Sequence, residues 1–169
     1  MSAGGAVLHV RRVVMTLGVA TAAACGTARG AATHGGVVGS YRVVAVQNRD
    51  SVTGQWRDLF GAAPAGYATY AADGTHTLQF TRTPAPTFGA RDDRAGTDAE
   101  LRAAFLGFFA WHGRWRLDAA RQVIIHEIEG SLWPSWRNTV QERPYRMRGD
   151  TLVLGDTLRA RRVFVRVRP

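Results

Sequence analysis

The strongest constraint on this chain is a series of short segments in which apolar and polar residues alternate, spread over residues 37–169. A period of two is typical of strands that bury one face. Turn residues separate the segments, among them Asp73 with Gly74 and Gly149 with Asp150. The predicted strands are GSYRVVAVQN, the two arms of GYATYAADGTHTLQFTR, HGRWRL, QVIIHEIEG, NTVQERPYRM, TLVLGD and RRVFVRV. This spacing predicts an all-β sandwich or barrel of about eight strands.

One α-helix is expected between the strands, over about residues 97–111. Thr97 and Glu100 have the spacing of a capping box, which marks a helix N-terminus. Apolar side chains then recur at intervals of three and four residues, the spacing of a helix that packs by one face: Leu101, Phe105, Phe108 and Phe109. We expect this helix to plug or flank the β-domain.

Residues 1–36 do not follow the strand pattern. Arg11 and Arg12 precede the apolar stretch 13–24, and small residues follow, which is the layout of an export signal. A membrane-spanning helix needs about 20 apolar residues, so a transmembrane anchor is not expected. The sequence therefore divides into an export leader with a flexible linker, residues 1–36, and one domain, residues 37–169, long enough to bury a core without disulfides.

Cys25 is the only cysteine and follows Thr-Ala-Ala-Ala directly, an arrangement that resembles a bacterial lipoprotein lipobox. A lipid attached to Cys25 would anchor the protein to a membrane. Those boxes usually place Leu where this chain has Ala22, and simple cleavage after Ala24 or Ala32, or a leader without structure, also fits. The expected location is the cell envelope as a lipoprotein, or the periplasm or medium as a secreted protein.

The positive charge does not indicate a nucleic-acid partner. All 22 basic residues are arginines, and with 13 acidic residues they give a formal charge of +9. They are scattered along the chain, whereas nucleic-acid binders usually concentrate charge on one face or arm. The domain has no cysteine after position 25, and His76, His112 and His126 do not show metal-ligand spacing. We expect neither a metal nor a cofactor, and the sequence does not decide the oligomeric state.

Several longer segments resemble the lipocalin-like domain family, small barrel proteins that are mostly uncharacterised. They are GSY at 39–41, GYATYAADG at 66–74, AFLGFFAWHGRW at 104–115, IIHEIEGSLWPSW at 124–136, and Arg143 followed by YRMRGDTLVL. The resemblance covers nearly all of residues 37–169. It implies an antiparallel up-and-down barrel of the calycin type, with an interior that holds one small hydrophobic molecule.

The resemblance also implies how one end of the barrel is closed. Lipocalins have a tryptophan where this chain has Tyr41, and this aromatic residue commonly packs under an arginine of the last strand. Arg162 and Arg166 are the two candidates for that contact.

The segment HEIEGSLWPSW, residues 126–136, looks at first like a catalytic or metal site. On a strand, however, His126 faces the side opposite to Glu127 and Glu129, so the three cannot easily act together. Pro134 lacks the amide that a central strand needs and should end the strand. The tryptophans beside it, Trp133 and Trp136, then form either an apolar corner or the mouth of a ligand site.

Strand parity gives the candidate ligand-binding side chains. His126 shares a face with two isoleucines, so it is either a buried imidazole or a proton-transfer group. An inward arginine at position 143 would pair with a carboxylate or hold an anionic ligand. The full predicted set is Tyr67, His76, Trp115, His126, Gln141, Arg143 and Tyr145.

Two functions follow from this interpretation. The first is an exported protein that binds a small hydrophobic molecule in its barrel. The alternative is an isomerase or cyclase that acts on a polyene or polyketide-like substrate, with His126 as the catalytic proton-transfer residue. Export favours the first. A barrel filled by its own side chains, acting through its surface, remains a third interpretation.

Overall fold

The computed structural model describes residues 36–89, 92, 95–156 and 158–168. The described residues form nine strands, one α-helix and one 3-10 turn. The strands are β1 (Gly39–Arg49), β2 (Trp56–Asp58), β3 (Ala65–Tyr70), β4 (Thr75–Thr81), β5 (Phe108–Asp118), β6 (Val123–Ser131), β7 (Thr139–Arg148), β8 (Thr151–Asp156) and β9 (Ala160–Arg166). The helix is α1 (Asp98–Gly107), and the 3-10 turn is η1 (Pro134–Trp136).

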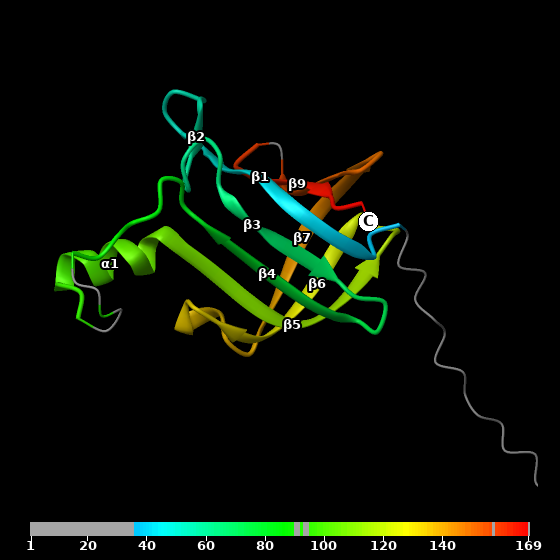
Figure 1. Cartoon of the computed structure of the whole chain (residues 1–169). Coiled ribbons are helices and arrows are strands. Elements are labelled where there is room, and N and C mark those ends of the chain that lie inside the picture. Colours follow the sequence, from blue (N-terminus) through cyan, green and yellow to red (C-terminus); the bar gives the residue numbers. More distant parts are fainter. Residues whose placement is uncertain (1–35, 90–91, 93–94, 157, 169) are drawn as a thin grey trace, which may run out of the picture. The chain divides into compact units, whose positions relative to one another are not determined.

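Eight of the strands close into an antiparallel barrel (Figure 1). Each strand from β3 to β9 pairs with the next along the chain, and β1 pairs with both β3 and β9. The short strand β2 pairs only with the end of β1 and lies outside this ring. The up-and-down, lipocalin-like barrel expected from the sequence is therefore confirmed.

The hairpins form where turn residues predicted them. Gly74 has a φ of 83° between β3 and β4, and Gly149 has a φ of 55° between β7 and β8, a region that glycine enters at little cost. Asp73 accepts a hydrogen bond at 2.8 Å from the backbone of Thr75 and so fixes the first turn.

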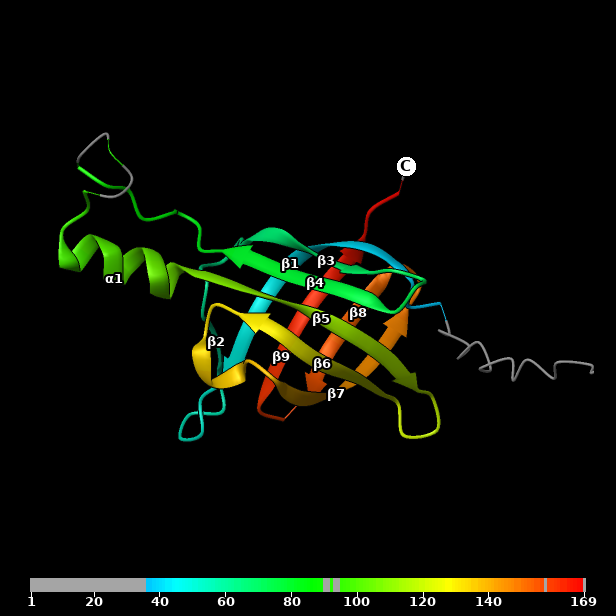
Figure 2. The ribbon, with the colours of Figure 1, turned by 90° about the horizontal axis from the view of Figure 1, so that it is seen from below.

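The helix is shorter than the sequence predicted and does not fill the barrel. Its capping box forms as expected between Thr97 and Glu100, but the helix ends at Gly107, and Phe108 and Phe109 already belong to β5. The spacing of apolar residues up to Phe109 fits a helix, but it also fits the alternation of a strand. Hydrogen bonding to β4 places Phe108 and Phe109 in β5. Figure 2 shows α1 beyond the end of the barrel rather than across it.

As a consequence, the expected apolar stripe is not buried. Leu101 and Phe105 are more than two-fifths exposed, and Gly107 is the one buried residue of α1. No helix among the described residues has the length and apolar character needed to cross a membrane.

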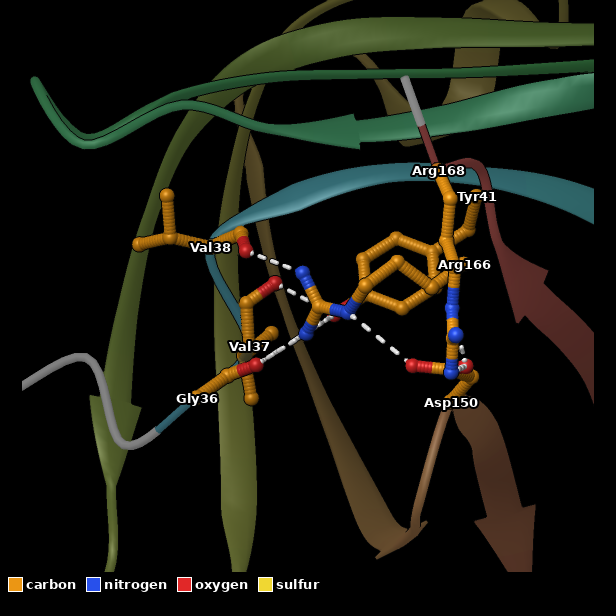
Figure 3. Close-up of polar contacts among 7 residues, drawn as sticks. All are labelled: Gly36, Val37, Val38, Tyr41, Asp150, Arg166 and Arg168. Atoms are coloured by element: carbon orange, nitrogen blue, oxygen red, sulfur yellow. Dashed lines mark hydrogen bonds and ion pairs between the residues drawn. The ribbon is translucent and has the colours of Figure 1, made fainter.

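One end of the barrel is closed by an arginine–tyrosine contact (Figure 3). The guanidinium of Arg166 lies 4.7 Å from the ring centre of Tyr41 and donates a hydrogen bond of 2.6 Å to its hydroxyl group. It also donates to the backbone carbonyls of Val38, at 2.6 Å, and Gly36. Of the two candidates from the sequence, Arg166 makes the contact, and Arg162 lies nearer the other end of β9.

Both ends of the described chain lie at this closed end. Gly36 contacts Arg166, and Val167 donates a backbone hydrogen bond to Ser40 at the start of β1. Arg168 forms an ion pair with Asp150 in the β7–β8 turn. The opposite end of the barrel carries the β6–β7 and β8–β9 connections and the start of β5 (Figure 2).

Removing Arg166 should destabilise the protein. Arg166→Ala deletes the ring contact and leaves two backbone carbonyls and the Tyr41 hydroxyl without their donor, which should lower the free energy of unfolding by about 2 kcal/mol. The control is Arg168→Ala, since Arg168 contacts the same Asp150 but its side chain is 77% exposed. Its effect should be below about 0.5 kcal/mol. Urea unfolding measures both, and equal losses would contradict this account of the closed end.

Candidate functional site

A cavity of about 380 Å³ lies in the half of the barrel opposite Arg166 and Tyr41. This volume falls within the range of about 300–1,000 Å³ typical of small-molecule sites. Its lining comes from every strand of the ring except β3 and β6, together with η1 and the segment after β2. The lining residues are Val46, Leu59, Phe60, Leu78, Phe80, Phe109, Trp111, Trp133, Trp136, Glu142, Arg143, Pro144, Leu154, Gly155, Asp156, Ala160 and Arg162.

Aromatic rings form one wall of the cavity. Strand β6 ends at Ser131, and Pro134 begins the 3-10 turn that brings Trp133 and Trp136 against Phe109. The ring centres of the two tryptophans lie 4.9 Å apart, and those of Phe109 and Trp133 lie 5.0 Å apart, both edge to face. Such packing fixes the rings in place. The two tryptophans are therefore part of the cavity wall.

Arg143 reaches this cavity from β7. Its Nη2 donates to the side-chain oxygen of Gln141 at 2.9 Å, and Gln141 in turn donates to Thr139 at 3.0 Å. The guanidinium lies 5.7 Å from the ring centre of Trp136. Gln141 thus orients the arginine, although it does not line the cavity itself.

A second arginine, Arg162, enters the cavity from β9. It shares the inward face of that strand with the fully buried Phe164 and with Arg166. Its Nη1 donates to the backbone carbonyl of Gln47 at 2.8 Å, to that of Arg161 at 3.0 Å and to the side chain of Asn48 at 3.2 Å. The sequence predicts Arg162 only as a candidate for the contact with Tyr41. Its place beside the cavity was not predicted, although the inward parity of Arg162 on this strand was a usable signal.

The two acidic residues in the lining have partners of their own. Glu142 forms two hydrogen bonds with Arg121, at 3.0 and 3.1 Å, and this arginine holds the pKa of Glu142 below its usual value. Asp156 accepts backbone hydrogen bonds from the turn that follows it, including one of 2.9 Å from Leu158, and the bonds from this turn lower its pKa. Neither carboxylate forms an ion pair with Arg143 or Arg162.

The middle of the barrel is filled by side chains around His126. This histidine is fully buried, and its Nδ1 lies 3.2 Å from the backbone carbonyl of Gln141. A carbonyl can only accept, so Nδ1 carries the proton and Nε2 accepts from the hydroxyl of Tyr70 at 2.9 Å. Burial, followed by the nearby His76, lowers the pKa of His126 to about 3. The imidazole is therefore neutral at physiological pH.

His76 occupies the same aromatic cluster without a hydrogen bond. It is 2% exposed, its ring centre lies 4.8 Å from that of His126, and neither of its nitrogens has a partner among the described residues. Burial, followed by the nearby His112, lowers the pKa of His76 to about 4. The indole N–H of Trp111 is also buried and has no hydrogen-bond partner in the part of the chain that the structure describes.

Of the seven side chains predicted to bind a ligand, only Arg143 lines the cavity. Trp115, 3% exposed, donates from its indole to the carbonyl of Ala71 at 3.0 Å and belongs to the core, as His76 and His126 do. Tyr145 packs half-buried against that core.

Tyr67 lies on the outer face of β3. It is 51% exposed, whereas its neighbours Ala68 and Tyr70 point inward and are buried. Parity separated Tyr67 from Tyr70 correctly but did not say which of them faced inward. No group of three or more metal-ligating side chains occurs in the described part of the chain. Cys25 and the leader lie outside the described residues.

Comparison with known proteins agrees with this architecture. Residues 38–163 match the model of the lipocalin-like domain family. The chain belongs to this family. It is also similar to a 4'-hydroxy-3'-methoxypropiophenone carrier protein of Aspergillus oryzae, with 33% identity over 84 residues, which cover 46% of this chain and 76% of the carrier.

Acid should destabilise the folded protein through the buried histidines. The pKa values of His76 and His126 in the folded state lie below the unfolded value of about 6.5, so the unfolded chain binds more protons between about pH 4 and pH 6.5. The contribution of these histidines to the free energy of unfolding is therefore fully present above this pH window. It is lost as the pH falls through the window, by up to about 1.4 kcal/mol per pH unit for each histidine.

His76→Leu tests this directly. Removing an unpaired buried imidazole should raise the free energy of unfolding by about 1 kcal/mol at pH 7.5 and by more at pH 5.0. Gln79→Leu, on the exposed outer face of the same strand, removes no titratable group and should leave the pH dependence unchanged. Urea unfolding at the two pH values measures both variants. If His76→Leu loses as much stability as the unmodified protein on acidification, His76 does not titrate as described.

Proposed function

We propose that this protein is an exported carrier that binds a small hydrophobic molecule in the cavity of its barrel. The observation that carries the proposal is the cavity of about 380 Å³, walled by Phe109, Trp133 and Trp136, at the end of the barrel away from Arg166. An apolar, preformed cavity with a few polar groups is the usual form of a small-molecule site. The similarity to a protein named as a carrier supports the same conclusion.

Aromatic compounds are the ligand class that best fits this wall. Flat rings can stack against or lie edge-on to the indole and phenyl groups there, with a gain beyond the apolar area they bury. The name of the related Aspergillus protein includes a propiophenone, which is an aromatic ketone with one ring. Compounds of comparable size are therefore the first to test.

The position of His126 supports carriage over catalysis. A proton-transfer residue must come within hydrogen-bond reach of the substrate. The imidazole of His126 is fully buried, uses both nitrogens in hydrogen bonds and does not line the cavity. The isomerase or cyclase alternative therefore gains no support from this geometry.

Blocking the cavity should abolish binding. Ala160 lines the cavity at the start of β9, and Ala160→Trp places an indole in that space. Val140→Trp adds the same side chain to the outer face of β7, at a residue that is 60% exposed. With 4'-hydroxy-3'-methoxypropiophenone or Nile red as the probe, titration calorimetry or dye fluorescence should show one site in the unmodified protein and in Val140→Trp.

In Ala160→Trp, affinity for the probe should fall by at least about tenfold, because the inserted indole competes for the same volume. Melting temperatures confirm that both variants fold. Native mass spectrometry of protein taken from its own host complements the titration by showing whether a ligand travels with it. A protein that arrives empty and binds neither probe would reject the carrier proposal.

Export and lipid attachment are a separate part of the proposal. Basic residues before an apolar stretch, and Cys25 after small residues, support a lipoprotein leader. The full chain produced in bacteria fed labelled palmitate should become labelled and partition into detergent, while Cys25→Ser should remain unlabelled. An unlabelled protein recovered from the periplasm would indicate simple cleavage, and one recovered from the cytoplasm would reject export.

A further inference from the structure

Two arginine side chains face the cavity with no acidic partner. Arg143 and Arg162 come from β7 and β9, and both line the cavity. Their hydrogen bonds go to neutral groups, namely amide side chains and backbone carbonyls. Within the described part of the chain neither forms an ion pair, although five other arginines do. Partly buried charges are normally paired, so this arrangement calls for an explanation.

The hydrogen-bonding capacity of Arg162 is largely unused. A guanidinium has five N–H donors, and all three protein contacts of Arg162 go through Nη1. Its Nε and Nη2 form the edge that binds a carboxylate through two parallel hydrogen bonds. This edge has no partner among the described residues.

Arg143 is held in place but also keeps free donors. Gln141 accepts from its Nη2 at 2.9 Å, and the carbonyl of Glu142 lies 3.4 Å from its Nη1. The Nε group of Arg143 has no protein partner among the described residues. Because Thr139 fixes Gln141, the guanidinium is oriented before any ligand arrives.

The electrostatic setting favours a negative ligand. Burial lowers the pKa of Arg143, and burial together with the charge of Arg143 lowers the pKa of Arg162 to about 10. Both groups remain protonated at neutral pH and repel one another. The two acidic residues in the lining, Glu142 and Asp156, bond instead to Arg121 and to backbone amides of the β8–β9 turn, and neither forms an ion pair with Arg143 or Arg162.

We propose that the ligand is a hydrophobic organic anion, such as an aromatic carboxylate, whose oxygens bind Arg143 and Arg162 while its apolar body packs against Trp133, Trp136 and Phe109. This inference rests on the proposed carrier function and names the class of molecule carried. The anion would supply the missing counter-charge, and the tryptophan wall would supply the apolar contact.

A pair of probes that differ only in charge tests the inference. 1-Naphthylacetate and 1-naphthylacetamide have nearly the same shape, but only the first is ionised at pH 7.5. Titration calorimetry should show the carboxylate binding at least about tenfold more tightly than the amide, since hydrogen bonds between charged partners are roughly twice as strong as neutral ones.

Substitution of single arginines by methionine shows which side chain causes the difference in affinity between the two probes, because methionine keeps an apolar chain and removes the charge. Arg143→Met and Arg162→Met should each weaken naphthylacetate at least about tenfold and change naphthylacetamide less than about threefold. Arg161→Met is the control. Arg161 is adjacent to Arg162 but does not line the cavity, and its guanidinium packs 4.3 Å from the ring centre of Trp56. Neither affinity should change.

The outcomes separate this inference from the carrier proposal. If both probes bind the unmodified protein equally and the arginine variants bind them alike, the cavity is a binding site but does not select anions. If neither naphthyl probe binds but 4'-hydroxy-3'-methoxypropiophenone or Nile red does, this inference fails and the carrier proposal stands. If none of the four compounds binds, both fail. Should Arg162→Met not fold, because Arg162 also binds the backbone of β1, Arg143→Met alone decides.

Discussion

Strand β1 (Gly39–Arg49) is the element on which the barrel depends. It is hydrogen-bonded to β3 on one side, to β9 on the other, and to β2 near its end. Without the pairing between β1 and β9 the strands would form an open sheet with two unpaired edges. Arg166 reinforces this closure, since it extends from the end of β9 to the ring and backbone at the start of β1.

The interior of the barrel has two parts with different roles. In the middle of the barrel, the aromatic cluster around Tyr70 and His126 fills the space, with Tyr70 1% exposed and His126 fully buried. Toward the end opposite the closed end, the rings of Trp133 and Trp136 stand beside a cavity. The barrel is therefore filled by its own side chains in one part and contains a cavity in the other. The filled part stabilises the fold, and the part with the cavity is available for a ligand.

Strand parity predicted much of the fold and only part of the site. It separated His126 from Glu127 and Glu129, and the structure buries the histidine and exposes both glutamates. Parity alone could not assign Tyr67 to the outside, because both faces of β3 carry aromatic residues. Nor could it show how far along the barrel each inward residue lies. The position of a residue along the barrel depends on the register of its strand with the neighbouring strands. It is this position that distinguishes Arg162, which lines the cavity, from Arg166 at the closed end.

The helix shows a different limit, since a run of apolar residues can satisfy two periods at once. Phe108 and Phe109 continue the spacing of the helix and also begin the alternation of β5, and only pairing with Thr81 and Phe80 decides between them.

Both ends of the described chain, Gly36 and Arg168, lie on the side of the barrel away from the cavity. A tag, a surface linkage or a fused fluorescent partner attached at either of these residues would therefore lie on the side of the barrel away from the cavity. This polarity would allow the domain to be immobilised on a surface with the cavity side left exposed and its strands unchanged.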